Sequence, residues 1–162
     1  MSTRPERLTT VERYHDFCAG HRVVGHESKC AHFHGHNYRV TFIVAGPIDK
    51  LGRVVDFGKL RALGEWLERE WDHRMLLWEG DPMLGPMLAL DDHMMHHKLQ
   101  RERGVVIVPF NPTAENLAEY LLFVVGPDVL EQIDANLRLV RVRVEETRKC
   151  ASESALLLDV SA

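Results

Sequence analysis

The chain has few cysteines, no excess of positive charge and no long apolar run, and each shortage excludes a class of protein. Its three cysteines, Cys18, Cys30 and Cys150, are odd in number and irregularly spaced, so we expect a reducing compartment and no disulfide framework. The formal net charge is -4 without a basic arm or stripe, which argues against a nucleic-acid partner. The apolar runs are too short to span a bilayer, and residues 1–10 are polar and lack the apolar core of a targeting segment. We therefore expect a cytoplasmic protein that binds neither nucleic acid nor a membrane.

The remaining composition is that of an ordinary globular protein, apart from its histidines. With 162 residues, 45% hydrophobic and 27% charged, the chain can bury roughly 70% of the surface of its unfolded form. We therefore expect residues 1–162 to form one domain. Histidine occurs ten times, mostly between residues 15 and 36 and between residues 93 and 97.

Alternation of apolar and polar residues, or a short run of β-formers, predicts strands over 11–21, 38–44, 139–147 and 155–160, with a shorter candidate at 105–108. In the second segment one face carries Tyr38, Val40, Phe42 and Val44. In the third, Glu146 lies on the face of the valines. A carboxylate on an apolar face needs a partner or a ligand, because burying it unpaired is costly.

Apolar residues at three- and four-residue steps predict two helices. The first runs from about Phe57 to Trp71, with Asp56 as its N-cap and an apolar stripe of Phe57, Leu60, Leu63, Leu67 and Trp71. The second opens at Pro112-Thr113 and places Leu117, Leu121 and Val124 on one face. Residues 79–104 show no regular pattern, and we expect an irregular insertion there. The order of elements predicts an α+β fold, a mainly antiparallel sheet with two helices on one face.

Three histidines can converge at one end of the first two predicted strands. His34 and His36 flank Gly35 where the second strand starts, so their imidazoles point to the same face. Antiparallel pairing brings the end of the first strand, His21, beside them. Zn²⁺ held by three imidazoles keeps a fourth position open, which is typical of catalytic sites. The pattern is therefore consistent with a zinc site of His21, His34 and His36.

Two other interpretations of these residues stay open. The histidines can be loop residues without a metal, or Cys30 can join His34 and His36 in a closed structural site completed by His21 or Cys18. A second cluster, His93, His96 and His97, lies in the irregular segment without an accompanying general base, and we assign it no site.

Further residues suit proton transfer and ligand binding. Cys30 precedes the histidine pair, and a thiol beside a metal ion and an imidazole can act as a base near neutral pH. Asp72 precedes His73 and can orient its imidazole, although such a dipeptide at a helix end is more often a cap. Glu146 can accept two parallel N–H bonds from the edge of a heterocycle, or it can pair with an arginine.

Six segments in this order resemble the family of 6-pyruvoyl-tetrahydropterin and 6-carboxy-tetrahydropterin synthases. They are Phe17-Cys18-Ala19-Gly20-His21, Cys30 with His34-Gly35-His36-Asn37-Tyr38, Val55-Asp56-Phe57, Asp72-His73-Arg74, Asn111-Pro112-Thr113-Ala114-Glu115-Asn116 and Val144-Glu145-Glu146-Thr147. The resemblance covers most of the chain.

The resemblance implies the tunnelling fold, in which a four-stranded antiparallel sheet and two helices per subunit assemble into a homohexameric barrel with sites at subunit interfaces. It implies Zn²⁺ on His21, His34 and His36. It also implies catalytic roles for Cys30, Asp72 and His73, and pterin binding by Glu146 and the region of Thr113.

The implied substrate is 7,8-dihydroneopterin triphosphate. The three-residue spacing between Cys30 and His34 resembles the carboxy-forming branch, which releases acetaldehyde and triphosphate on the route to queuosine and related deazapurines. The pyruvoyl-forming reaction and a non-catalytic zinc- or pterin-binding module are the alternatives. The chain departs from the family after Asp72-His73, where Met75-Leu76-Leu77-Trp78 replaces the usual leucine and asparagine and residues 79–104 exceed the usual length.

Overall fold

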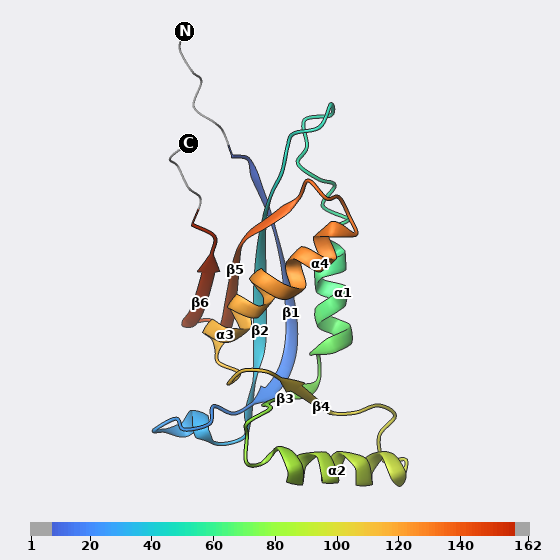
Figure 1. Ribbon diagram of the computed structural model, residues 1–162, viewed down its shortest axis with the longest axis vertical. Helices are drawn as coiled ribbons and strands as arrows, with labels where there is room; N and C mark the ends of the chain where they lie inside the picture. Colours follow the sequence, from blue (N-terminus) through green and yellow to red (C-terminus); the bar gives the residue numbers. More distant parts are fainter. Residues whose placement is uncertain (1–7, 158–162) are drawn as a thin grey trace.

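The computed structural model describes residues 8–157 and shows a six-stranded sheet with helices against one face (Figure 1). The strands are β1 (Thr10–His21), β2 (His34–Ala45), β3 (Arg74–Trp78), β4 (Val105–Val108), β5 (Arg138–Thr147) and β6 (Cys150–Ala155). The helices are α1 (Arg61–Glu70), α2 (Leu84–His96), α3 (Ala114–Tyr120) and α4 (Gly126–Glu131). A π-helical turn over Leu121–Val125 joins α3 to α4.

The centre of the sheet is the long antiparallel pair β1 and β2, which runs in register from Thr10 opposite Ala45 to His21 opposite His34. β5 and β6 continue the sheet antiparallel beyond β2, as predicted. β3 and β4 add two short parallel strands on the other side of β1, giving the order β4-β3-β1-β2-β5-β6. The α+β prediction is therefore confirmed, while four strands is an undercount and the sheet is mixed.

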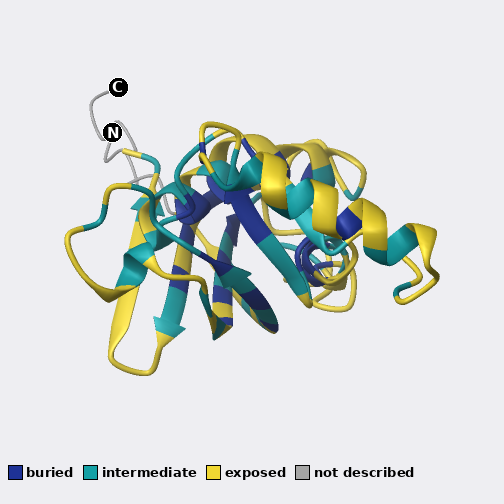
Figure 2. Cartoon of the chain, turned by 90° about the horizontal axis from the view of Figure 1, so that it is seen from below, coloured by how far each residue is buried: buried dark blue, intermediate teal, exposed yellow. Residues whose placement is uncertain are grey.

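The buried face of the sheet carries the side chains that the alternation predicts. Tyr38, Val40, Phe42 and Val44 are all 0% exposed. They pack under α1 and under the α3–α4 segment, which contribute Leu60, Leu63, Leu67, Leu117, Leu121, Leu122 and Val125. Figure 2 shows buried residues concentrated in the central strands, with exposed residues in the loops and on the outer sides of the helices.

The first helix begins later than predicted. α1 starts at Arg61, and Asp56 does not cap it, because the Asp56 carboxylate accepts a hydrogen bond from the Gly58 amide at 2.7 Å within a preceding turn. Phe57 lies in that turn and is 59% exposed. In the second helical segment, the π-turn shifts the phase of the apolar stripe, so Val125 is buried and Val124 is exposed.

The segment 79–104 is not irregular throughout, because it contains the thirteen-residue helix α2. This helix buries only Asp91, so its sequence has no apolar stripe to reveal it. The predicted strand at 155–160 is also displaced: β6 ends at Ala155, and residues 158–160 lie outside the described residues.

Candidate metal centre

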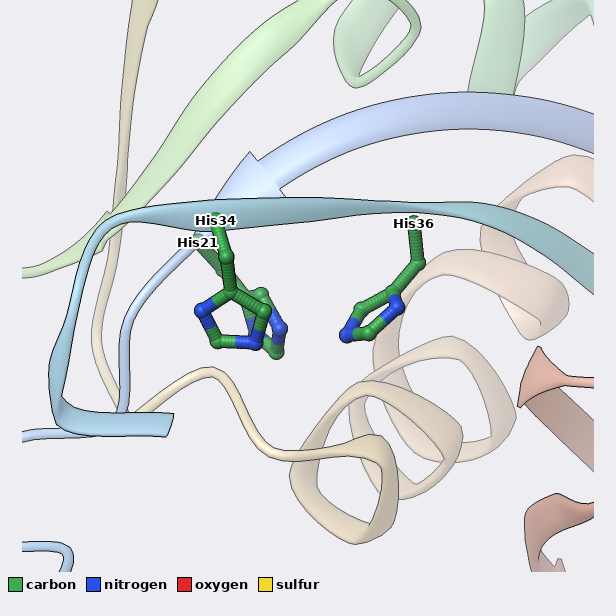
Figure 3. A group of neighbouring side chains, drawn as sticks. All are labelled: His21, His34 and His36. Atoms are coloured by element: carbon green, nitrogen blue, oxygen red, sulfur yellow. The ribbon is translucent and has the colours of Figure 1, made fainter. Parts of the chain in front are cut away.

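The hairpin of β1 and β2 brings His21, His34 and His36 together. Each offers a nitrogen, and these atoms lie within 4.8 Å of one another. The ring centroids are 4.4 Å apart for His21 and His34, 5.1 Å for His21 and His36, and 5.0 Å for His34 and His36. Figure 3 shows the three imidazoles projecting to the same side of β2. The cluster can hold a metal ion by its donor set.

His21 is prepared to act as a ligand through its Nε2 atom. Its Nδ1 lies 2.7 Å from the carbonyl oxygen of Pro112, and since a carbonyl only accepts, Nδ1 carries the proton. Burial lowers the pKa of His21 to about 4, so the ring is neutral at physiological pH. Nε2 is buried, and within residues 8–157 it has no hydrogen-bond partner. An unpartnered buried lone pair fits a metal ligand, so these residues fit the metal that the histidine pattern suggests.

His34 and His36 complete the donor set. The Nδ1 atom of His34 donates to the carbonyl of His32 at 2.8 Å, which leaves its Nε2 for a ligand role. Burial, with a smaller effect of His34, lowers the pKa of His36. Gly35 lies between the two ligands, and a Cβ atom there would be 2.9 Å from the Ala19 carbonyl oxygen on β1. Gly35 therefore allows β1 and β2 to approach closely beside the histidine cluster.

Glu146 faces the histidine cluster from β5. Its carboxylate oxygens lie 3.8 Å from His21 Nε2 and 3.9 Å from His36 Nε2. Burial raises the pKa of Glu146, and the nearby carboxylate of Glu115 raises it further. The predicted carboxylate on the valine face therefore meets histidines rather than an arginine.

Asp72 and His73 pair with each other beside Cys18 of β1. The Asp72 carboxylate lies 2.8 Å from His73 Nδ1 and also accepts a hydrogen bond from the Cys18 amide at 2.8 Å. The His73 amide donates to the Cys18 carbonyl, and His73 has a left-handed backbone with φ of 58°. The His73 side chain is 79% exposed, so most of its imidazole is accessible to a ligand or to another chain.

The Asp72–His73 pair is not part of the histidine cluster. Side chains alternate along β1, so Cys18 points to the face opposite His21, where its thiol donates to Asn37 at 3.2 Å. Asp72 and His73 line a surface hollow of about 1050 Å³ on that side together with Cys18 and Asn37, and His36 and Glu146 also border it.

Cys30 and Thr113 lie in the two segments that flank the cluster. Cys30 belongs to a 3₁₀ turn, Lys29–Ala31, in the β1–β2 loop, and its carbonyl accepts from the Val23 amide at 2.7 Å. Cys30 is not among the ligand atoms of the histidine cluster, so within the described residues the closed site containing it is not formed. Thr113 is the N-cap of α3, and its hydroxyl accepts from the Asn116 amide at 3.3 Å.

Asn111 is a positioning residue that the sequence did not single out by itself. Its side chain accepts from the Val24 amide at 2.9 Å and donates to the Val24 carbonyl at 2.8 Å. This clamp holds the end of β1 against the Pro112 carbonyl that orients His21. The only sequence signal for it was its place before a proline and an N-cap.

The chain was compared with known proteins. The family model described as 6-pyruvoyl tetrahydropterin synthase matches residues 10–155. The 6-carboxy-5,6,7,8-tetrahydropterin synthase of Rickettsia typhi is 35% identical over 140 residues, covering 85% of this chain and 94% of that protein. An uncharacterized protein of Wolinella succinogenes has the same fold, with a TM-score of 0.74 at 22% identity over 93% of this chain and 99% of that one. The Caenorhabditis elegans 6-pyruvoyl tetrahydropterin synthase aligns with a TM-score of 0.59 at 23% identity, over 94% and 99%. Among residues 8–157, no helix has the length and apolarity needed to cross a membrane.

Proposed function

Because the chain belongs to the 6-pyruvoyl tetrahydropterin synthase family, we propose that it is a zinc-dependent 6-carboxy-5,6,7,8-tetrahydropterin synthase. It converts 7,8-dihydroneopterin triphosphate and water into 6-carboxytetrahydropterin, acetaldehyde and triphosphate, in a cytoplasmic route to queuosine and related deazapurines. The observation that carries this proposal is the three-histidine cluster with Glu146 facing it. The curated relatives that carry this enzyme name support the choice of reaction.

In this proposal His21, His34 and His36 hold Zn²⁺ through their ring nitrogens. The orphaned Nε2 of His21 and the fixed tautomers of His21 and His34 support that assignment. When bound, Zn²⁺ supplies Lewis-acid polarisation of the substrate's side-chain oxygens. The three protein ligands leave an open position for those oxygens.

Glu146 anchors the pterin ring. A carboxylate accepts two parallel N–H bonds from an aminopyrimidine edge, and this one is partly buried beside the cluster, where water competes little. Thr113 follows Pro112, whose carbonyl contacts His21, so the start of α3 borders the same region. The ring is thereby held with its side chain toward the histidines.

Proton transfer is assigned to Cys30, Asp72 and His73. Cys30 removes a proton from the substrate's side chain, and His73, oriented by Asp72, serves the second proton step as triphosphate leaves. The 2.8 Å contact occupies His73 Nδ1 and leaves Nε2 for the substrate.

The side chain of His73, which is 79% exposed, supports an active site shared between subunits of a homo-oligomer. We therefore include a hexamer with sites at subunit interfaces in the proposal. Each site then combines the histidines, Cys30 and Glu146 of one subunit with Asp72 and His73 of another.

The test is product identity. Purified, zinc-loaded protein is incubated with 7,8-dihydroneopterin triphosphate, and the products are separated. Acetaldehyde together with the carboxy pterin is the expected result. A 6-pyruvoyl product would show that the chain catalyses the pyruvoyl-forming reaction instead. No turnover at full zinc occupancy would show that the chain is a binding module and not an enzyme.

A matched pair of cysteine variants tests the assignment of Cys30. Cys30→Ala is expected to abolish turnover while zinc content stays at the wild-type level. Cys150→Ala is the control, because that thiol is exposed on β6. Loss of zinc in Cys30→Ala would instead make Cys30 a ligand of the metal.

A further inference from the structure

Arg22 and Asp81 form an ion pair, with Asp81 buried and Arg22 partly buried, at the end of the β1–β2 hairpin. Arg22 Nε lies 3.4 Å from Asp81 Oδ2, and their side chains are 19% and 1% exposed. Within the described residues neither of these two atoms makes a hydrogen bond. The ion-pair contact between them is therefore the compensation that each of these two buried atoms has for its lost hydration.

Arg22 links the two chain segments that adjoin the histidine-bearing strands. It directly follows His21, the last residue of β1, and its guanidinium lies 5.2 Å from the ring centroid of Phe33. Phe33 directly precedes His34, the first residue of β2. The Arg22 side chain thus bridges the two chain segments next to the metal ligands and closes the loop that holds Cys30.

Asp81 is held firmly at the start of the 79–104 segment. Its Oδ1 accepts from the Met83 amide at 2.7 Å, and its own amide donates to the Trp78 carbonyl at 2.9 Å. These bonds fix its position between the end of β3 and the start of α2. The carboxylate therefore presents a fixed charge to Arg22.

Stability alone is a weak explanation for this pair. Apolar residues of similar size are often as stabilising as a buried ion pair, because the charges lose hydration. An arginine that bridges the two segments next to the histidines is better explained by a role in orienting them, since groups around a metal site orient its ligands.

We infer that Arg22 and Asp81 are positioning residues, through which the 79–104 segment sets the relative position of His21 and His34. The inference rests on the proposed metal centre. It assigns the segment a role in building the site, although α2 itself lies beyond the end of the sheet (Figure 1).

The first experiment uses Co²⁺ as a spectroscopic probe in the full-length protein. Asp81→Asn and Arg22→Met are each expected to weaken Co²⁺ binding about 10- to 100-fold and to change its visible absorption spectrum. The double variant is expected to lose the same factor as each single variant, because the two residues act as one unit. Asp92→Asn is the control, since Asp92 is an exposed carboxylate of α2 that pairs with Arg103. Unchanged affinity and spectrum in the Asp81 and Arg22 variants would overturn the inference.

Hydrogen exchange of the metal-free protein gives a second readout that does not depend on metal binding. Amides between residues 22 and 33 are expected to exchange faster in Asp81→Asn, while β5 amides keep their wild-type rates. Equal exchange of the 22–33 loop in variant and wild type would contradict the inference, even if wild-type protein bound metal and turned over substrate. Suppose that the 22–33 loop exchanges faster in Asp81→Asn but the wild-type protein binds no metal. This result would support the positioning role of the Arg22–Asp81 pair and refute only the proposed metal centre.

Discussion

His21 Nδ1 donates to the Pro112 carbonyl at 2.7 Å, although the two residues are 91 positions apart in the chain. The bond fixes the tautomer of the most buried histidine of the cluster, and a backbone carbonyl cannot be changed by substitution. Asn111 can be changed, and it clamps Val24 against the same turn.

Asn111→Ala is therefore expected to weaken zinc affinity about 10- to 100-fold, the usual effect of removing a group that orients a metal ligand. Competition with a chromophoric chelator measures the change. Asn136→Ala is the control, because the Asn136 amides donate to the Asp134 carboxylate within their own turn. If the affinity of Asn111→Ala matches the wild type, the clamp does not orient His21.

The zinc content of the protein is expected to depend on His21, His34 and His36 and not on the histidines between residues 93 and 97. His36→Ala is expected to reduce zinc from about one ion per chain to a small fraction, because two imidazoles bind zinc weakly. The double variant His93→Ala/His97→Ala tests the histidines at the end of α2, His93 and the C-cap residue His97, whose ring centroids are 4.3 Å apart. It should retain the full content by elemental analysis. The opposite pattern would move the metal to α2.

Mixing inactive variants tests whether two subunits share each site. Cys30→Ala and His73→Ala are each expected to be inactive. When they are co-expressed in equal amounts and assemble at random, about a quarter of the sites contain both wild-type residues, so about a quarter of wild-type turnover should return. No recovered activity would place Cys30 and His73 of one site on the same chain.

The sequence predicted the elements whose residues follow a clear pattern. β2 and β5 alternate, β1 is rich in β-formers, and α1 and α3 carry an apolar stripe, so all five were predicted, although α1 begins later than expected. β3 was missed because Met75-Leu76-Leu77 is apolar without alternation and directly follows a helix. α2 was missed because only Asp91 is buried in it.

The close contact between Gly64 on α1 and the His15 ring gives a stability prediction with a matched control. His15 packs against Gly64, and a Cβ atom at Gly64 would overlap its ring. Gly64→Ala is expected to destabilise the protein by about 1–2 kcal/mol in urea unfolding, because crowding outweighs the gain in helix propensity. Gly85→Ala on α2 meets nothing within 4 Å and should stabilise by up to about 1 kcal/mol. Equal stability of Gly64→Ala and wild type would mean that the His15 ring moves aside.

Asp91 gives a pH dependence of stability. Burial alone would raise its pKa, but bonds from the Gly104 amide and Gln100, with Arg103 nearby, together hold the pKa below its usual value of 3.8. A carboxyl with a lowered folded pKa stabilises the fold above its unfolded value, and this contribution is lost as the pH falls through the folded value.

Asp91→Asn should therefore lower the free energy of unfolding by about 1.5–3 kcal/mol at pH 6 and make a smaller difference in strong acid. Urea unfolding at both pH values measures this, with Asp92→Asn as the exposed neighbour that changes little. A difference that stayed constant down to pH 2 would exclude the Asp91 charge as its cause.

The sequence predicted those parts of the candidate site that neighbouring strands bring together. It did not predict the contacts that segments far apart in the chain make. His21, His34 and His36 follow from strand alternation and antiparallel pairing. The Pro112 carbonyl, Asn111 and the Arg22–Asp81 pair depend on how loops far apart in the chain pack. Such contacts leave no periodic signal in the sequence.

The close approach of Gly35 to Ala19 limits how this candidate metal centre could be transplanted. Three histidines grafted onto another hairpin would keep the donor set, but a side chain between the two β2 histidines would meet the opposite carbonyl at 2.9 Å and push the strands apart. Protein designers who borrow the motif need to copy the spacing between two backbones as well as the imidazoles.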